Sequence, residues 1–172
     1  MSPTPSTLIL GWGNPGRLDD GLGPAAADAV AQLRSPGVVA DSDYQLTVED
    51  AAEVARYPRV VFVDADPSGA PPFRWQRLHA SARGPGFSTH GVTPGAVLSL
   101  SRDLFGAEPE AWLLGIRGYE FDRFGEGLSE RARENLSRAV SFLRSAIESG
   151  EFPGDGPTGG SPPRDPDREV EP

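Results

Sequence analysis

Short apolar runs alternate along the chain with segments that carry apolar residues at helical spacing. Four of these runs are short enough for buried strands: 7–10 (TLIL), 45–48 (QLTV), 59–64 (RVVFVD) and 111–116 (AWLLGI). The run 59–64 is apolar almost throughout, which favours a central position in a sheet. Residues 73–78 (FRWQRL) instead alternate between apolar and polar side chains, which predicts a half-exposed strand at a sheet edge.

Capping residues and periodicity predict four helices. Pro24 suits the first turn of an alanine-rich helix, and residues 49–56 (EDAAEVAR) form a second one. Helices are also expected over 93–105 and 129–147, each with its first residue, a Thr or a Ser, as the N-cap. The apolar residues predicted to face the core are Val97, Leu98, Leu100 and Leu104 in the third helix and Leu136, Val140, Leu143 and Ile147 in the fourth.

Strands that alternate with helices indicate an α/β fold with three layers, in which a largely parallel, twisted sheet is flanked by helices on both faces. This domain is expected to span residues 1–150. Residues 151–172 contain six Pro, four Gly and six acidic residues, with few apolar side chains to bury. They are therefore predicted to form a disordered acidic tail.

The composition narrows the chemistry. The chain has 16 basic residues, all Arg, against 25 acidic ones, and this net charge of −9 argues against nucleic acid or an anionic membrane as a partner. No cysteine is present, which excludes disulfides, thiolate metal sites and a Cys nucleophile. No apolar run approaches the ~20 residues of a membrane helix. Because the first residues also lack the pattern of a signal peptide, a cytoplasmic protein is expected.

A glycine-rich loop follows the first predicted strand. Residues 11–16 (GWGNPG) have the G-x-G-x-x-G spacing of dinucleotide-binding loops. In that motif a helix begins at once and binds the pyrophosphate with its free N–H groups. Here Asp19 and Asp20 come before the helix and would oppose a phosphate electrostatically, so a dinucleotide-binding domain is the less favoured alternative.

The candidate site residues follow predicted strands, because ligands of α/β sheets bind at the carboxyl ends of strands. Asp20 lies in the glycine-rich loop, Asp64 ends the strand 59–64, and His90 precedes a helix. Two carboxylates and one imidazole would suit Ni, Zn, Mn or Fe(II) if the fold brings them together. The simpler interpretation of Asp19, Asp20 and Asp66 is turn formation, and His79 is expected at the surface.

These residues occur in ordered blocks that resemble the hydrogenase maturation proteases. The blocks are 8–14 (LILGWGN), 17–23 (RLDDGLG), 63–65 (VDA), 88–90 (STH), 113–116 (LLGI) and 128–129 (LS). The resemblance implies an endopeptidase that removes the C-terminal peptide of a nickel–iron hydrogenase large-subunit precursor after nickel insertion. The protein is expected to act as a monomer.

The resemblance assigns roles to single residues. Asp20, Asp64 and His90 match the three metal-binding positions of the family, although the first is often Glu in its members. The metal is expected to be nickel supplied by the substrate, and Asp19 is expected either to orient a ligand or to accept a proton. A non-catalytic chaperone of the large subunit would carry the same motifs and is the principal alternative.

Overall fold

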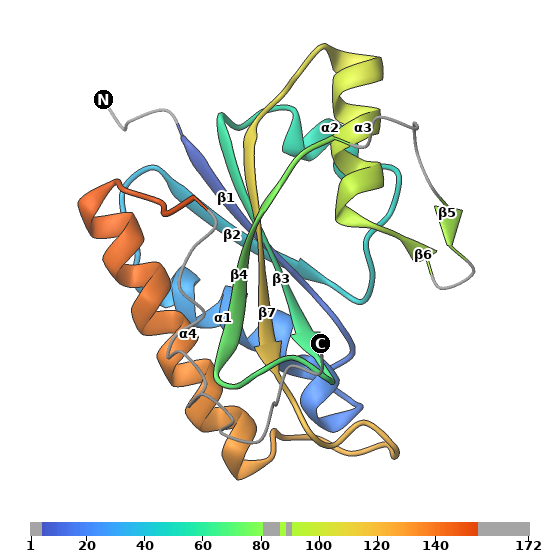
Figure 1. Cartoon of the computed structure of the whole chain (residues 1–172), viewed down its shortest axis with the longest axis vertical. Helices are drawn as coiled ribbons and strands as arrows, with labels where there is room; N and C mark the ends of the chain where they lie inside the picture. Colours follow the sequence, from blue (N-terminus) through green and yellow to red (C-terminus); the bar gives the residue numbers. More distant parts are fainter. Residues whose placement is uncertain (1–4, 81–86, 89–90, 155–172) are drawn as a thin grey trace, which may run out of the picture.

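Five strands form one sheet with the order β2-β1-β3-β7-β4 (Figure 1). The computed structural model describes residues 5–80, 87–88 and 91–154. The strands of the sheet are β1 (Thr7–Trp12), β2 (Val38–Asp43), β3 (Arg59–Asp66), β4 (Phe73–Leu78) and β7 (Glu110–Arg117). Two further strands, β5 (Phe87–Ser88) and β6 (Gly91–Val92), pair separately in an antiparallel ladder.

The strand β3 lies at the centre of the sheet, as its apolar run predicts. It pairs in parallel with β1 on one side and with β7 on the other. The strand β4 runs antiparallel to β7 and forms one edge, which confirms the prediction from its alternating pattern. Because β1, β2, β3 and β7 are parallel, their carboxyl ends share one edge of the sheet.

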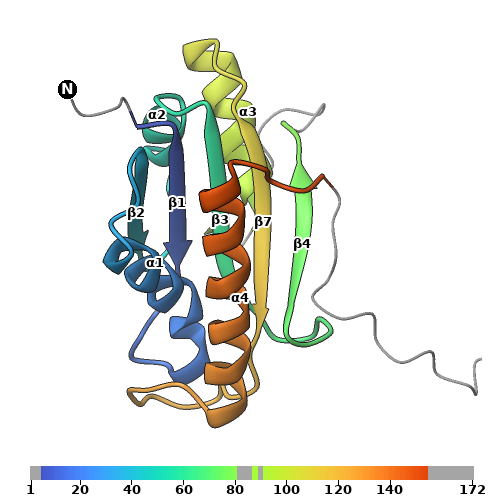
Figure 2. The same ribbon diagram turned by 90° about the vertical axis from the view of Figure 1, so that its left-hand side faces the viewer.

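Helices cover both faces of the sheet, which confirms the predicted three-layer α/β architecture. In Figure 2, α1 (Leu22–Gln32) and α4 (Glu130–Ser149) lie in front of the sheet, and α2 (Asp50–Val54) and α3 (Pro94–Phe105) lie behind it. Each face has its own apolar cluster. Val61 of β3 packs on the α1 and α4 side, whereas Phe62 packs on the α2 and α3 side. Burial of each such side chain contributes about 1.5–3 kcal/mol.

Three helix starts can be compared with the prediction. Ser129 caps α4 by accepting a hydrogen bond from the backbone N–H of Ala132 (3.3 Å), and Thr93 caps α3 by accepting one from Ala96 (3.1 Å). Helix α1 begins at Leu22, two residues before the predicted Pro24, after the 3-10 turn η1 (Leu18–Gly21). None of the helices described here combines the length and the apolar character of a membrane span.

Two predictions about secondary elements are wrong. Residues 45–48 form a loop, and the strand that pairs with β1 is β2, six residues with little apolar character. A strand at a sheet edge has one neighbour and solvent on its other side, so it does not need a continuous apolar run. Leu104 is 67% exposed rather than buried, because only the first two turns of α3 pack on the sheet side.

The domain continues past residue 150, where the predicted boundary lay. The backbone carbonyl of Pro153 accepts hydrogen bonds from the indole N–H groups of Trp75 (3.1 Å) and Trp112 (2.7 Å). Phe152 packs on the same two rings, so the residues directly after α4 belong to the core. The predicted tail from residue 155 onward lies outside the described residues.

Candidate functional site at the carboxyl edge of the sheet

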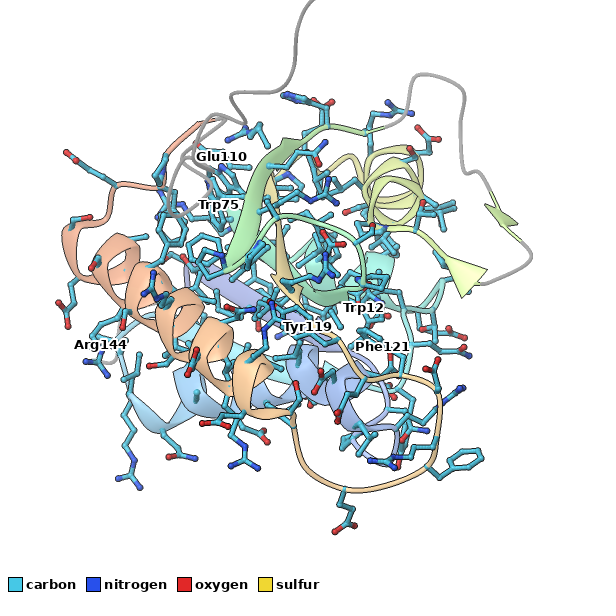
Figure 3. All side chains as sticks on the ribbon, turned by 60° about the horizontal axis from the view of Figure 1, so that its bottom comes forward. Trp12, Trp75, Glu110, Tyr119, Phe121 and Arg144 are labelled. Carbon is cyan, nitrogen blue, oxygen red and sulfur yellow. The ribbon has the colours of Figure 1, made fainter. Side chains whose placement is uncertain are left out.

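Loops from distant parts of the chain meet at the carboxyl edge of the sheet. Residues 13–21 follow β1, and residues 118–129 connect β7 to α4. Backbone hydrogen bonds join the two loops: Leu18 donates to the carbonyl of Gly125 (3.0 Å), and Asp19 donates to that of Glu120 (3.0 Å). In Figure 3 this end of the molecule is turned toward the viewer, with Trp12 of β1 and Tyr119 of the later loop labelled.

The glycines of the first loop allow close backbone packing. A Cβ atom on Gly13, whose φ is +141°, would overlap the backbone carbonyl of Asp20. A Cβ atom on Gly23 would overlap the carbonyl oxygens of Trp12 and Val63. The space that a dinucleotide's pyrophosphate needs beside such glycines is therefore filled by the chain's own backbone, which argues against the dinucleotide-binding alternative.

Asp20 is a half-buried carboxylate in the turn η1. Its Oδ2 atom accepts a hydrogen bond from the backbone N–H of Asn14 at 2.8 Å, which fixes the carboxylate against the start of the same loop. Asn14 in turn accepts a hydrogen bond from the N–H of Gly16 at 2.8 Å through its side chain. The loop thus holds Asp20 in one position through short-range hydrogen bonds.

Asp64 is a partly buried carboxylate near the carboxyl end of β3. Burial is the main reason that its pKa rises to about 7, and the negative charges of Asp20 and Asp66 raise it further. Its one hydrogen bond, from the backbone N–H of Ala65 (2.8 Å), opposes this rise only in part. The effect of Asp20 on this pKa places the two carboxylates within electrostatic reach of each other at the sheet edge.

Asp19 is fully buried and accepts four hydrogen bonds. The donors are the backbone N–H groups of Tyr119 (2.8 Å), Glu120 (3.0 Å) and Ser129 (2.7 Å) and the Ser129 hydroxyl (2.7 Å). Burial by itself would raise the pKa of Asp19, but these donors outweigh it and lower the pKa below 3.8. Asp19 therefore ties η1 to the loop before α4 and holds its neighbour Asp20 in place.

His90, the third predicted ligand, lies outside the described residues. Among the residues that are described, no group of three His, Cys, Asp or Glu side chains could hold a metal ion. The described part of the predicted site is the pair Asp20 and Asp64. In the sequence, residue 90 comes between β5 and β6, and the capped helix α3 follows β6.

Asp66 is a structural residue, as predicted. Its carboxylate accepts hydrogen bonds from the N–H groups of Ser68 (3.0 Å) and Gly69 (2.8 Å) and forms an ion pair with Arg74 (2.8 Å). Although burial opposes them, these contacts lower the pKa of Asp66. It shapes the turn between β3 and β4 and keeps its negative charge near Asp64.

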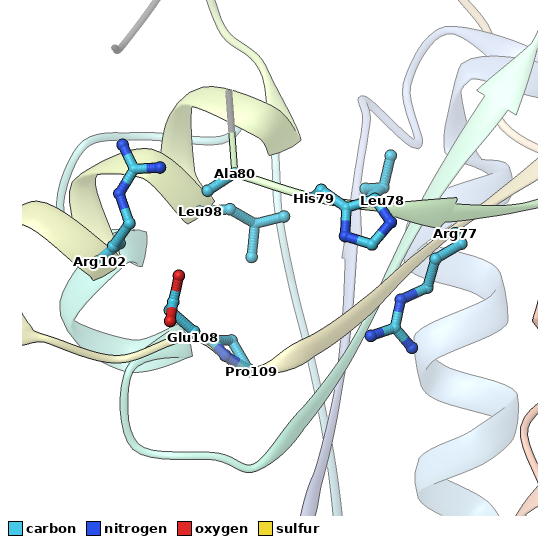
Figure 4. Close-up of a pocket in the computed structure, with 8 residues that line it drawn as sticks. All are labelled: Arg77, Leu78, His79, Ala80, Leu98, Arg102, Glu108 and Pro109. Atoms are coloured by element: carbon cyan, nitrogen blue, oxygen red, sulfur yellow. The ribbon is translucent and has the colours of Figure 1, made fainter. Parts of the chain in front are cut away.

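The opposite end of the sheet has a hollow of about 230 Å³ (Figure 4). It is lined by Arg77 and His79 at the end of β4, by Arg102 of α3 and by Glu108 before β7. Because β4 is antiparallel, this end is the amino edge of the parallel strands, far from Asp20 and Asp64 along each strand. The exposed position of His79 agrees with its predicted place at the surface.

Solved structures of hydrogenase maturation proteases match most of the chain. The hydrogenase 2 maturation peptidase of a Thaumarchaeota archaeon has a TM-score of 0.62 at 25% identity, with 83% of this chain and 98% of that one covered. The [NiFe] hydrogenase maturation protease HycI of Thermococcus kodakarensis gives 0.65 at 24%, over 86% and 95%. The hydrogenase maturating endopeptidase HybD of E. coli gives 0.64 at 21%, over 84% and 93%.

Comparisons based on sequence alone give no match. No protein-family model matches the chain, and no curated protein does. By its structure, the chain has the fold of the hydrogenase maturation proteases.

Proposed function

We propose that this protein is an endopeptidase that removes a C-terminal peptide from the large subunit of a nickel–iron hydrogenase after nickel insertion. The observation that carries the proposal is the pair Asp20 and Asp64, which the fold of these proteases holds at one sheet edge within electrostatic reach. Within the described residues, Asp64 accepts one hydrogen bond, and burial together with the charge of Asp20 raises its pKa. Such a poorly satisfied carboxylate is suited to a cation.

In this proposal the cation is nickel that arrives with the substrate. Asp20 and Asp64, together with His90, would contact the ion and so distinguish a loaded large subunit from an empty one. An ion bound there polarises a nearby peptide carbonyl or activates water, either of which promotes hydrolysis. A covalent acyl-enzyme on cysteine is ruled out because the chain has no Cys.

The raised pKa of Asp64 gives the recognition step a pH dependence. Near pH 7 about half of the Asp64 side chains carry a proton, which a cation must displace before it binds. Below pH 7 the protonated fraction grows, so the affinity for the loaded substrate is expected to fall. Above pH 7 the carboxylate is already charged, and the affinity should reach a plateau.

Asp19 supports the site as a positioning residue in this proposal. Its two oxygens already accept four hydrogen bonds, and its lowered pKa makes it a weak base at neutral pH. Proton acceptance would require some of these bonds to break. We therefore assign Asp19 the orientation of Asp20 rather than proton transfer.

The test is processing of a candidate large-subunit precursor that is co-expressed with the full chain. Intact mass spectrometry should show the loss of a C-terminal peptide. Asp20→Asn, Asp64→Asn and His90→Ala should each reduce cleavage by at least about 100-fold, which corresponds to about 2.7 kcal/mol. Asp103→Asn, a matched change on the exposed side of α3, should leave it unchanged.

The outcomes separate the two main functions. Cleavage that survives in all three site variants would contradict the proposed site. Stable binding of the precursor without any release of a peptide would instead identify the chain as a non-catalytic chaperone. Circular dichroism of each variant distinguishes loss of chemistry from loss of fold.

A further inference from the structure

Two guanidinium groups meet at one phenol ring beside the candidate site. The guanidinium carbon of Arg117 lies 4.9 Å from the ring centroid of Tyr119, and that of Arg131 lies 4.0 Å from it. Arg117 ends β7, whereas Arg131 lies in the first turn of α4. Cation–π contacts of this kind hold the planar groups in place without consuming their hydrogen-bond donors.

The three side chains retain donors for a ligand. Arg117 donates through Nε to the carbonyl of Gly118 (3.0 Å) and through Nη1 to that of Gly69 (2.8 Å), which leaves its Nη2 group. The Tyr119 hydroxyl accepts a hydrogen bond from the Asn135 amide (3.1 Å), so its own proton can be donated elsewhere. Arg131 is exposed.

Among the described residues, neither arginine has an acidic partner. In the part of the chain that the structure describes, no ion pair involves Arg117 or Arg131, although the whole chain has nine more acidic than basic residues. Arg74, in contrast, lies close to the same edge and is paired with Asp66. Two unpaired guanidinium groups on one ring make a local site that is complementary to an anion.

The position of this cluster links it to the candidate site. The backbone N–H of Tyr119 donates to the buried Asp19, which is the residue before Asp20. Tyr119 also lines a hollow of about 340 Å³ together with Leu18, Arg123 and two acidic residues, Glu120 and Asp122. A polypeptide that reaches Asp20 therefore has room to pass along the same loop.

We propose that Arg117, Tyr119 and Arg131 bind a carboxylate of the polypeptide substrate. The inference rests on the proposed function, because a C-terminal peptide that is to be removed always ends in an α-carboxylate. The side chain of an acidic residue in that peptide would offer the same chemistry. The three residues act in binding and lie apart from the cleavage chemistry, so they affect KM rather than kcat.

The test compares two changes that remove the same charge from the same helix in the full chain. Arg131→Gln should raise KM for the precursor about three- to tenfold with kcat unchanged, which is the range of one partly exposed charge-assisted contact. Arg138→Gln, farther along α4 and also exposed, should leave KM unchanged. Added salt should raise KM more for the wild type than for Arg131→Gln, because salt screens the charge that the variant lacks.

A synthetic peptide with the sequence of the precursor's C-terminus identifies the source of the carboxylate without any cleavage. Its binding to the full chain, measured by fluorescence anisotropy, should weaken in Arg131→Gln and stay the same in Arg138→Gln. If the α-carboxylate is bound, amidation of the peptide weakens binding to the wild type and has no effect on Arg131→Gln. If an acidic side chain of the peptide is bound instead, replacing that side chain by its amide weakens binding to the wild type and has no effect on Arg131→Gln.

Equal peptide binding by the wild type, Arg131→Gln and Arg138→Gln would overturn the inference, whether or not the precursor is cut. If the precursor stays uncut but its peptide binds through Arg131, the proposed endopeptidase activity is contradicted. The carboxylate-binding site is then still supported. The two failures are therefore distinguishable.

Discussion

Two regions of the sheet are built from different chemistry. At the carboxyl edge, carboxylates are packed against backbone N–H groups and close-packed glycines, and one of them, Asp64, is poorly satisfied. Within β4 and β7, Trp75 and Trp112 stack at 5.6 Å and donate both indole N–H groups to one carbonyl, that of Pro153. The carboxylates place negative charge where a ligand can reach it, whereas the two tryptophans fill the core and pair their N–H groups inside it.

The carboxyl edge itself contains a second contrast. Asp19 accepts four hydrogen bonds and has a lowered pKa, whereas Asp64 accepts one and has a pKa near 7. Burial raises both pKa values, but at Asp19 the donors outweigh it, whereas at Asp64 the charges of Asp20 and Asp66 add to it. The fold stabilises the charged form of Asp19 and disfavours that of Asp64. This difference separates a residue that supports the site from one that is available to a cation.

The largest effect on stability is expected for Asp19→Asn. The change replaces an acceptor of four hydrogen bonds by a side chain whose NH₂ group would face donors, and it should lower the free energy of unfolding by about 3 kcal/mol. Because the lowered pKa of Asp19 contributes stability above about pH 4 and loses it as pH falls further, the gap to the wild type should narrow in acid. Urea unfolding at pH 7 and pH 3 measures both. An unchanged urea midpoint at pH 7 would show that Asp19 does not stabilise the fold.

Removal of the residues after α4 should give the next largest effect. A chain that ends at Gly150 loses the packing of Phe152 on two tryptophans and the shared acceptor of Pro153, and it should be about 2–3 kcal/mol less stable. A chain that ends at Gly154 keeps these contacts and serves as the control. Thermal unfolding and a red shift of tryptophan fluorescence report the loss. Equal melting temperatures of the two truncated chains would contradict the assignment of these residues to the core.

The smallest and opposite effect is expected for Asp64→Asn. The raised pKa means that the wild type loses stability as pH rises from about 4 to 7, because the unfolded chain gives up this proton first. The amide does not ionise, so the variant should melt at a higher temperature than the wild type at pH 8 and at nearly the same temperature at pH 4. A variant that is less stable than the wild type at pH 8 would show that Asp64 serves the fold.

Much of this arrangement could be predicted from local patterns, and the exceptions have physical causes. The central strand β3 follows from its apolar run, and the approach of Asp20 to Asp64 follows from the shared carboxyl edge of parallel strands. The edge strand β2 was misplaced because solvent covers its free side, so its sequence needs no apolar run.

Other features depend on contacts between distant parts of the chain. The donors to Asp19 lie 100 to 110 residues away, and no spacing near Asp19 indicates them. The Leu-Ser pair before the last helix was the only local sign of them, since Ser129 serves both as the cap of α4 and as a donor to Asp19. Phe152 was assigned to the tail because Pro, Gly and acidic residues dominate the composition around it, although its ring packs on two distant tryptophans.

We propose that Asp20 and Asp64 recognise nickel carried by the substrate. This is tested by the rate at which the full chain cleaves one purified large-subunit precursor, prepared with and without nickel, at pH 8. We expect rapid cleavage of the loaded precursor and none of the empty one. Equal rates for the two preparations would contradict it.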